Sequence, residues 1–183
     1  MASKSEFGSP VHLAGRFFGA LWPAGPGKDD DQWARSQLLP GEVALWERMS
    51  GPDQRHAVSV ARQAVSLVGG SPPVGREFIA AALLHDVGKV ESGLGTFSRV
   101  AVTLAALAVG RRRLVGSASS APAKSMRARV GAYLSHDKLG GQLLRAAGSD
   151  GFTVAWAEQH HMPKERWQVD ARLGEALKTA DGD

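Results

Sequence analysis

The stretch Ala80-Ala81-Ala82-Leu83-Leu84-His85-Asp86-Val87-Gly88-Lys89 decides how this chain is expected to fold. Its apolar first half is typical of a buried helix, and a histidine and an aspartate follow directly where that helix is expected to stop. Gly88 is predicted to end the helix, because glycine adopts a positive φ without a Cβ clash. Two metal-binding side chains at the end of a buried helix indicate a metal site if other ligands join them.

Two such ligands lie on helix faces that are expected to point inward. His56 shares one face of a predicted helix with Val60, after the helix-start signal Ser50-Gly51-Pro52-Asp53. Asp181 follows Leu177 at an interval of four, which places it on a core-facing stripe. A carboxylate on such a stripe needs a partner, and a metal ion would supply one. Taken alone, His56 is better explained as a core histidine with an ordinary hydrogen bond.

The remaining segments predict helices, with no strand pattern of comparable strength and no internal repeat, so the fold class is all-α. Residues 96–109 are nearly all apolar and are expected to be buried, whereas residues 111–123 are expected to form a loop. Helices are predicted over residues 40–49, 50–68, 77–85, 96–109, 125–135, 138–147, 152–161 and 170–181. Asp150 and Asp170 are expected to cap the last two of these helices at their N-terminal ends.

The chain is long enough for one sizeable domain, expected over residues 36–183. Residues 1–35 are expected to form an N-terminal arm with little regular structure, and the first ten of them resemble a vector-derived tag. The absence of cysteine excludes a disulfide framework, a zinc ribbon and a thiol nucleophile. No apolar run reaches the roughly 18–20 residues that span a bilayer, and no secretory signal is evident. A cytoplasmic protein without a transmembrane segment is therefore expected.

The positive charge of the chain is concentrated in one segment. The formal net charge is +4, and no aspartate or glutamate lies between Ser92 and His136. Such a block is expected to attract phosphates or an acidic surface, and a solvated arginine loop explains it equally well. Its basic residues are Arg99, Arg111, Arg112, Arg113, Lys124, Arg127 and Arg129, of which Arg111, Arg112 and Arg113 are the candidates for phosphate binding.

The order of the histidines and aspartates resembles the HD superfamily of metal-dependent phosphohydrolases, whose pattern is H…HD…D with further histidines in its dinuclear branch. The matching residues are His56, His85, Asp86, His136, His160 and Asp181. The resemblance covers roughly residues 50–183 and implies an HD-domain helical bundle. HDVGK and His160-His161 also resemble parts of the HD-GYP cyclic-dinucleotide phosphodiesterases. The Gly-Tyr-Pro element of that group is absent, so its substrate is not implied.

The resemblance implies two divalent transition-metal ions, with iron or manganese favoured and zinc, nickel or cobalt as alternatives. One ion would take His56, His85, Asp86 and Asp181, and the second would take Asp86 as a bridge together with His136 and His160. Asp86 and Lys89 would be the catalytic residues. Lys89 would contact the substrate phosphate or assist the leaving group, although a solvated surface lysine fits the sequence as well. His161 is expected to hydrogen-bond a ligand or the substrate.

The implied activity is hydrolysis of a nucleotide or a small phosphodiester, as in a phosphodiesterase or nucleotidase, by a hydroxide held between the two ions. A nuclease is a variant of this function, so the expected partner is a phosphorylated small molecule, a nucleotide or a nucleic acid. Two other classes stay open. HD-type diiron oxygenases use the same six ligands, and non-catalytic HD modules serve in signalling or binding.

Overall fold

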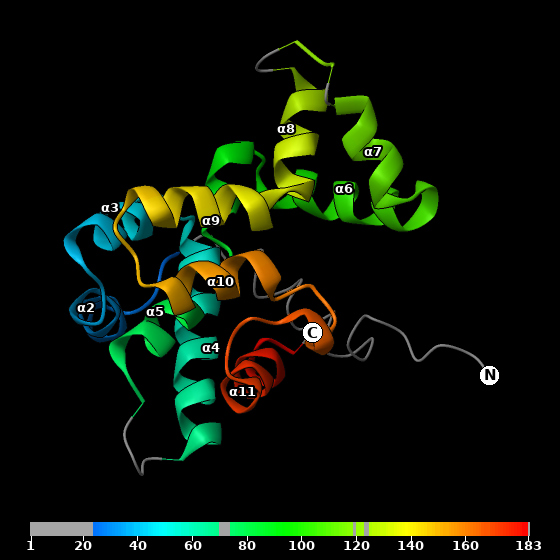
Figure 1. The fold of residues 1–183 in the computed structure, drawn as a ribbon. Helices are drawn as coiled ribbons and strands as arrows, with labels where there is room; N and C mark the ends of the chain where they lie inside the picture. The colour runs from blue at the N-terminus through cyan, green and yellow to red at the C-terminus, as the bar shows by residue number, and fades with distance from the viewer. Residues whose placement is uncertain (1–23, 70–73, 119, 123–124, 183) are drawn as a thin grey trace.

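The computed structural model describes residues 24–69, 74–118, 120–122 and 125–182 (Figure 1). Over these residues the chain is helical and has no strand, which confirms the all-α prediction. The elements in chain order are α2 (Lys28–Ser36), α3 (Pro40–Arg48), α4 (Gly51–Val68), α5 (Arg76–Leu84), the 3-10 helix η1 (Val87–Ser92), α6 (Thr96–Val109), α7 (Arg111–Ala118), α8 (Met126–Leu134), α9 (His136–Ala146), α10 (Gly151–Gln159), the 3-10 helix η2 (Lys164–Arg166) and α11 (Ala171–Asp181).

The helix-start signals in the sequence act as expected. Ser50, Asp150 and Asp170 each accept a hydrogen bond from a backbone N–H in the first turn of α4, α10 and α11, respectively. These bonds satisfy donors that have no partner within the helix. They fix where α4 begins, which in turn places His56 near the first turns of that helix.

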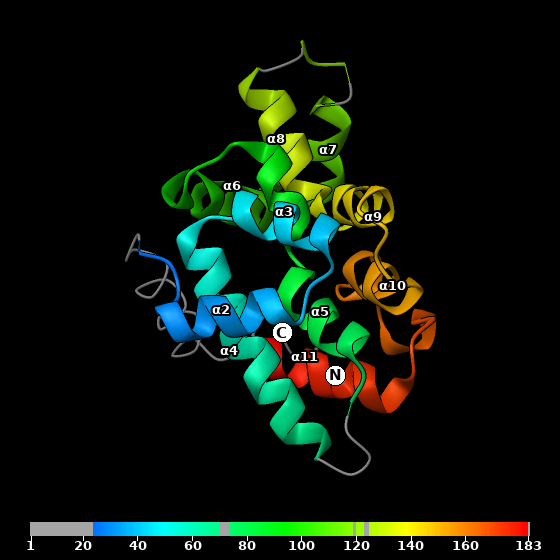
Figure 2. The same ribbon diagram turned by 90° about the vertical axis from the view of Figure 1, so that its left-hand side faces the viewer.

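Helix α5 is the centre of the main core. Phe78 and every residue from Ala80 to Leu84 are buried, and α5 packs between α4 and α10 (Figures 1 and 2). Helix α11 packs on α4, while α9 packs on α10 and η1. The predicted buried lead-in to the histidine–aspartate pair is therefore present, and α5 ends at Leu84, directly before His85.

Gly88 has a different role from the predicted one. It does not have a positive φ; the chain continues past it as η1, which ends at Gly93 with a φ of +57°. A Cβ atom on Gly88 would lie 1.9 Å from the carbonyl oxygen of His136 and 2.6 Å from the backbone nitrogen of Gly140. Glycine is needed here because η1 and α9 approach each other backbone to backbone.

The last part of the predicted N-terminal arm forms helix α2. The run Asp29–Asp31 lies in the first turn of α2, where acidic side chains interact favourably with the positive end of the helix dipole. Trp46 Nε1 donates a hydrogen bond to Asp31 Oδ1 at 2.9 Å, which ties α2 to α3. Residues 1–23, which make up most of the predicted arm, lie outside the described residues.

Two predictions about the basic segment are wrong. The predicted loop at residues 111–123 begins with helix α7. Helix α6 forms as predicted, but among its residues whose burial is described, Val102 is the one that is buried. Helices α6, α7 and α8 stand together at one end of the molecule (Figures 1 and 2) around a small core of Leu94, Val102 and Leu134.

Within the described residues no single helix is long and apolar enough to cross a membrane. Only Arg76–Ser92 and Phe97–Val109 taken together pass that test, and the two are bent by 92°.

Candidate metal centre

Three helices of the main core end at one place. His85 and Asp86 directly follow α5, His160 and His161 directly follow α10, and Asp181 is the last residue of α11. The C-terminal ends of helices carry partial negative charge, and here they add to the charge of two carboxylates. The resulting environment favours a bound cation.

Three of the histidine rings at this place are held in the same way. Each Nδ1 lies at hydrogen-bond distance from the backbone carbonyl oxygen three residues earlier, in the last turn of the preceding helix, where carbonyls lack helical partners. The pairs are His85 with Ala82 at 2.9 Å, His136 with Tyr133 at 2.8 Å and His160 with Ala157 at 3.0 Å. A carbonyl oxygen only accepts, so each Nδ1 must carry the proton and donate it. Neutral rings in this state present the Nε2 lone pair to the centre.

His56, His85 and Asp181 form the first group, whose ligand atoms all lie within 4.8 Å of one another. Asp181 Oδ1 lies 2.8 Å from His56 Nε2 and 3.6 Å from His85 Nε2. His85 and Asp181 are buried, whereas His56 is partly open to solvent. His56 on α4 and Asp181 on α11 are thus in contact, although they are 125 positions apart in sequence.

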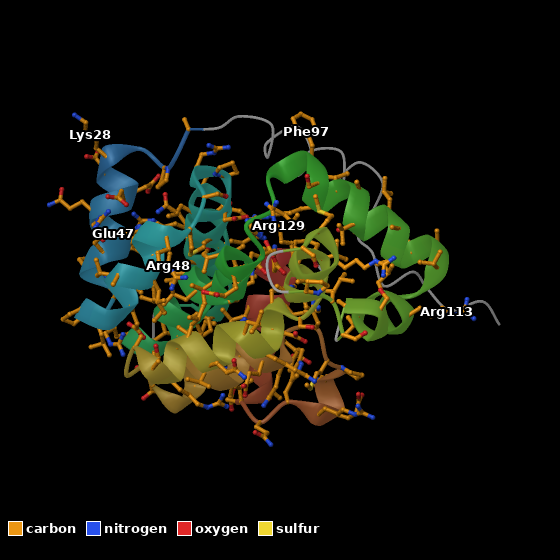
Figure 3. All side chains as sticks on the ribbon, turned by 90° about the horizontal axis from the view of Figure 1, so that it is seen from above. Lys28, Glu47, Arg48, Phe97, Arg113 and Arg129 are labelled. Carbon is orange, nitrogen blue, oxygen red and sulfur yellow. The ribbon has the colours of Figure 1, made fainter. Side chains whose placement is uncertain are left out.

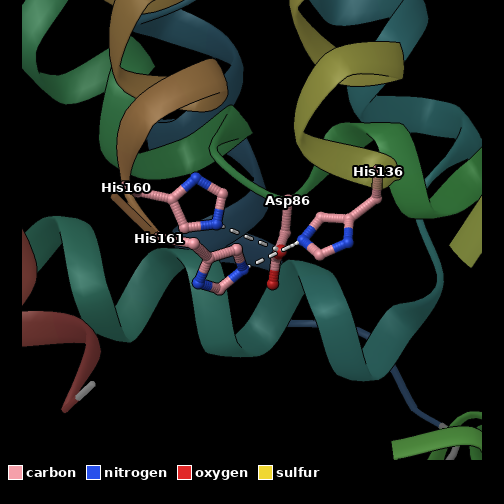
Figure 4. A group of neighbouring side chains, drawn as sticks. All are labelled: Asp86, His136, His160 and His161. Atoms are coloured by element: carbon pink, nitrogen blue, oxygen red, sulfur yellow. Dashed lines mark hydrogen bonds and ion pairs between the residues drawn. The ribbon is translucent and has the colours of Figure 1, made fainter. Parts of the chain in front are cut away.

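Asp86, His136, His160 and His161 form the second group, which meets the same distance limit (Figure 4). Asp86 Oδ1 lies 3.2 Å from His136 Nε2 and 3.9 Å from His160 Nε2. His161 Nε2 lies 3.2 Å from His136 Nε2. Asp86 therefore stands between His136 on one side and His160 with His161 on the other, and His161 is the exposed member.

The Asp86 carboxylate, a member of the second group, also approaches the first group. Its Oδ1 faces the second group, while its Oδ2 lies 3.4 Å from Nε2 of His85 and forms an ion pair with Lys89. One carboxylate with an oxygen on each side is the arrangement in which an aspartate can bridge two ions.

The two carboxylates make the site favourable for positive charge. Burial opposes charge on His85, but the Asp86 and Asp181 carboxylates raise the pKa of His85 to about 10. Burial likewise opposes charge on Asp86, but Lys89 and His85 hold the pKa of Asp86 well below its usual range. In the absence of an ion, a proton and an ammonium group thus compensate the two carboxylates.

Two of the histidine ring nitrogens also suit a metal ion, because they make no hydrogen bond. His85 Nε2 and His160 Nε2 are buried and have no hydrogen-bond partner. Burial, with the charge of His85 adding to it, lowers the pKa of His160 to about 3, so His160 is neutral as a ligand must be. A buried nitrogen without a partner is costly, and a metal ion would satisfy it. Imidazole and carboxylate donors suit iron, manganese, zinc, nickel and cobalt.

The structure brings together all six residues predicted as ligands. Lys89 forms an ion pair with Asp86, and His161 lies beside His136 in the second group. The predicted phosphate-binding segment is not brought to the centre, because α7 packs against α6 and α8. Arg113 points outward at the edge of the molecule (Figure 3). The side chains of Arg111 and Arg112 lie outside the described residues.

Two contacts beside the centre were not predicted. Arg99 Nη1 lies 2.6 Å from Asp53 Oδ2, which joins α6 to α4 three residues before His56. Thr103 Oγ1 lies 3.2 Å from the hydroxyl of Tyr133, three residues before His136. These pairs are 46 and 30 positions apart in sequence, so no local pattern could have revealed them.

Comparisons of the chain with protein-family models, curated proteins and solved structures gave no match. The geometry and chemistry of the two ligand groups are therefore the basis for a function.

Proposed function

We propose that the chain is a metal-dependent phosphohydrolase of the HD type, acting on a nucleotide or a small phosphodiester. The observation that supports this most is the position of Asp86, whose two oxygens face two separate ligand groups. Paired metal ions that share a ligand are typical of enzymes that displace a group at phosphorus.

The two ions would be held by different parts of the chain. His56, His85, Asp86 and Asp181 would hold the first ion, and Asp86, His136 and His160 would hold the second. When bound, the ions would lower the pKa of a water molecule and polarise the phosphoryl oxygens of the substrate.

The protein's own groups position this chemistry. The carbonyl oxygens of Ala82, Tyr133 and Ala157 fix the rings before any ion binds, which reduces the reorganisation needed for binding. The buried end of α5 keeps water away from the inner side. His56 and His161 mark the side that solvent and a substrate can reach.

Lys89 would act on the substrate as well as on Asp86. Its ammonium group pairs with the bridging carboxylate, and that pairing raises the pKa of Lys89 against the effect of burial. A permanently charged ammonium beside the two ion positions suits an anionic phosphoryl group. With Asp86 engaged in holding the ions, Lys89 would donate a hydrogen bond to a phosphate or leaving-group oxygen.

The test combines metal analysis with a generic substrate. Purified protein would be reconstituted with Mn²⁺, its metal content measured, and hydrolysis of bis(p-nitrophenyl) phosphate followed. We expect two ions per chain and Mn²⁺-dependent turnover. Asp86→Asn should lose both ions and all turnover, because the neutral amide is a poor bridge, while the exposed Asp29→Asn should match the wild type.

Other outcomes would overturn the proposal. Two tightly bound irons with no hydrolysis of any phosphodiester would point to a dioxygen-using enzyme. A chain that binds no metal after reconstitution would be a non-catalytic module. Full turnover in Asp86→Asn would show that the chemistry takes place elsewhere.

A further inference from the structure

Helix α6 has an apolar face that no part of the described chain covers. Phe97, Ala101, Leu104 and Ala108 recur at the spacing of one helix side, and all four are exposed. Phe97 and Leu104 are exposed by 72% and 61%. Figure 3 shows Phe97 pointing away from the body of the molecule. A contiguous row of this kind on a surface marks an interaction site.

The same part of the molecule carries only positive charge. The chain has no acidic residue between Ser92 and His136, so α6, α7 and α8 lack any. Two of the arginines there have structural roles, since Arg99 pairs with Asp53 and Arg129 Nε donates to the carbonyl oxygen of Ser92 at 3.1 Å. Arg113 and Arg127 are exposed.

The exposed apolar row and the positive charge of α6, α7 and α8 together indicate the kind of partner. A second copy of the chain would bring two sets of arginines together with no acidic residue to pair with them. An anionic lipid surface accepts both features, because the apolar side chains enter the acyl boundary while the arginines meet the phosphates. Helix α6 spans about 21 Å at 1.5 Å per residue, so it would lie along the interface rather than cross about 30 Å of hydrocarbon.

We propose that the outer face of α6, together with the exposed basic residues of the neighbouring helices α7 and α8, docks on anionic phospholipid membranes. The inference does not depend on the proposed activity. Docking would nevertheless hold the metal centre close to the lipid, because Arg99 joins α6 to α4 near His56 and Thr103 joins α6 to Tyr133 near His136.

The test is cosedimentation of the full chain with vesicles of phosphatidylcholine alone and of phosphatidylcholine with one third phosphatidylglycerol. We expect binding to the anionic vesicles that weakens as salt is raised. Leu104→Glu should weaken it about tenfold or more, because a charge replaces an inserted leucine. Leu67→Glu is the matched control: Leu67 is 50% exposed on α4, outside the docking face, and its variant should bind like the wild type.

A second pair of variants tests the charge without changing the apolar face. Arg113→Glu should weaken binding to anionic vesicles several-fold, and Arg172→Glu, an exposed change on α11, should not. No binding to anionic vesicles, or equal losses in Leu104→Glu and Leu67→Glu, would overturn the proposal. So would a wild-type dimer in sedimentation velocity that Leu104→Glu converts to monomer while vesicles bind neither protein, because the covering partner would then be a second copy.

Discussion

At the scale of single residues, the centre is built from side chains that are fixed by the backbone behind them. His160 is the clearest case: Nδ1 is held by the carbonyl oxygen of Ala157, while Nε2 is buried and has no hydrogen-bond partner. Its neighbour His161 is exposed, and its Nε2 lies near that of His136. Two adjacent histidines thus meet very different surroundings, although the sequence shows them as a pair.

We therefore expect the two histidines to differ on substitution. His160→Gln should reduce the metal content from two ions to one, because nothing else can supply the buried nitrogen. His161→Gln should keep both ions and lower the affinity for the second about 10- to 100-fold, as for groups that support a ligand. Isothermal titration with Mn²⁺ and elemental analysis after dialysis would measure both effects. If His161→Gln also lost an ion, His161 would itself be a metal ligand, like His160.

At the scale of elements, the position of η1 against α9 determines how the two ligand groups face each other. Asp86 immediately precedes η1, and His136 begins α9. The two elements touch through Gly88, where an added Cβ would meet backbone atoms rather than a side chain that could move. The gap between Asp86 and His136 is thus set by one close backbone approach.

Gly88→Ala should separate η1 from α9. We expect a loss of about 1–3 kcal/mol in the free energy of unfolding, as for an overpacked core, together with weaker Mn²⁺ binding because His136 moves away from Asp86. Gly116→Ala is the control, since a Cβ there meets nothing within 4 Å and Gly116 lies inside α7. That variant should gain about 0.5–1 kcal/mol from helix propensity. Urea unfolding would measure both; equal stability of the two variants would contradict the account.

Element boundaries were the most predictable part of the fold, because local chemistry sets them. The caps at Ser50, Asp150 and Asp170 start their helices where the sequence indicated. Burial was less predictable. The apolar composition of Thr96–Val109 suggested a core helix. Composition does not reveal, however, whether other parts of the chain cover every face of a helix, and the described chain leaves the outer face of α6 exposed.

At the scale of the whole molecule, the candidate centre joins residues from 56 to 181. The inward positions of His56 and Asp181 followed from helical periodicity, and the family resemblance added His136 and His160 to the set. What the sequence did not indicate is the contact geometry: which oxygen of Asp86 faces which histidine, and how Arg99 reaches Asp53. Such contacts depend on how helices pack, which no local pattern encodes.

Because the ligands come from α4, α11, the start of α9 and the ends of α5 and α10, bound metal should hold most of the main core together. Without it, a proton on His85 and the Lys89 ammonium compensate the carboxylates, so the chain should stay folded but be less stable. At a free metal concentration about 100 times Kd, each ion adds about 2.7 kcal/mol, so two ions add about 5 kcal/mol. For a chain of this size, chelation with EDTA should then lower Tm by about 10–20 °C. Differential scanning calorimetry would measure the shift, and Asp86→Asn, which should bind no ion, is the matched control and should show none. A wild-type Tm that is identical with and without EDTA, after loading with two ions has been verified, would mean that the ions do not bind at these helix ends.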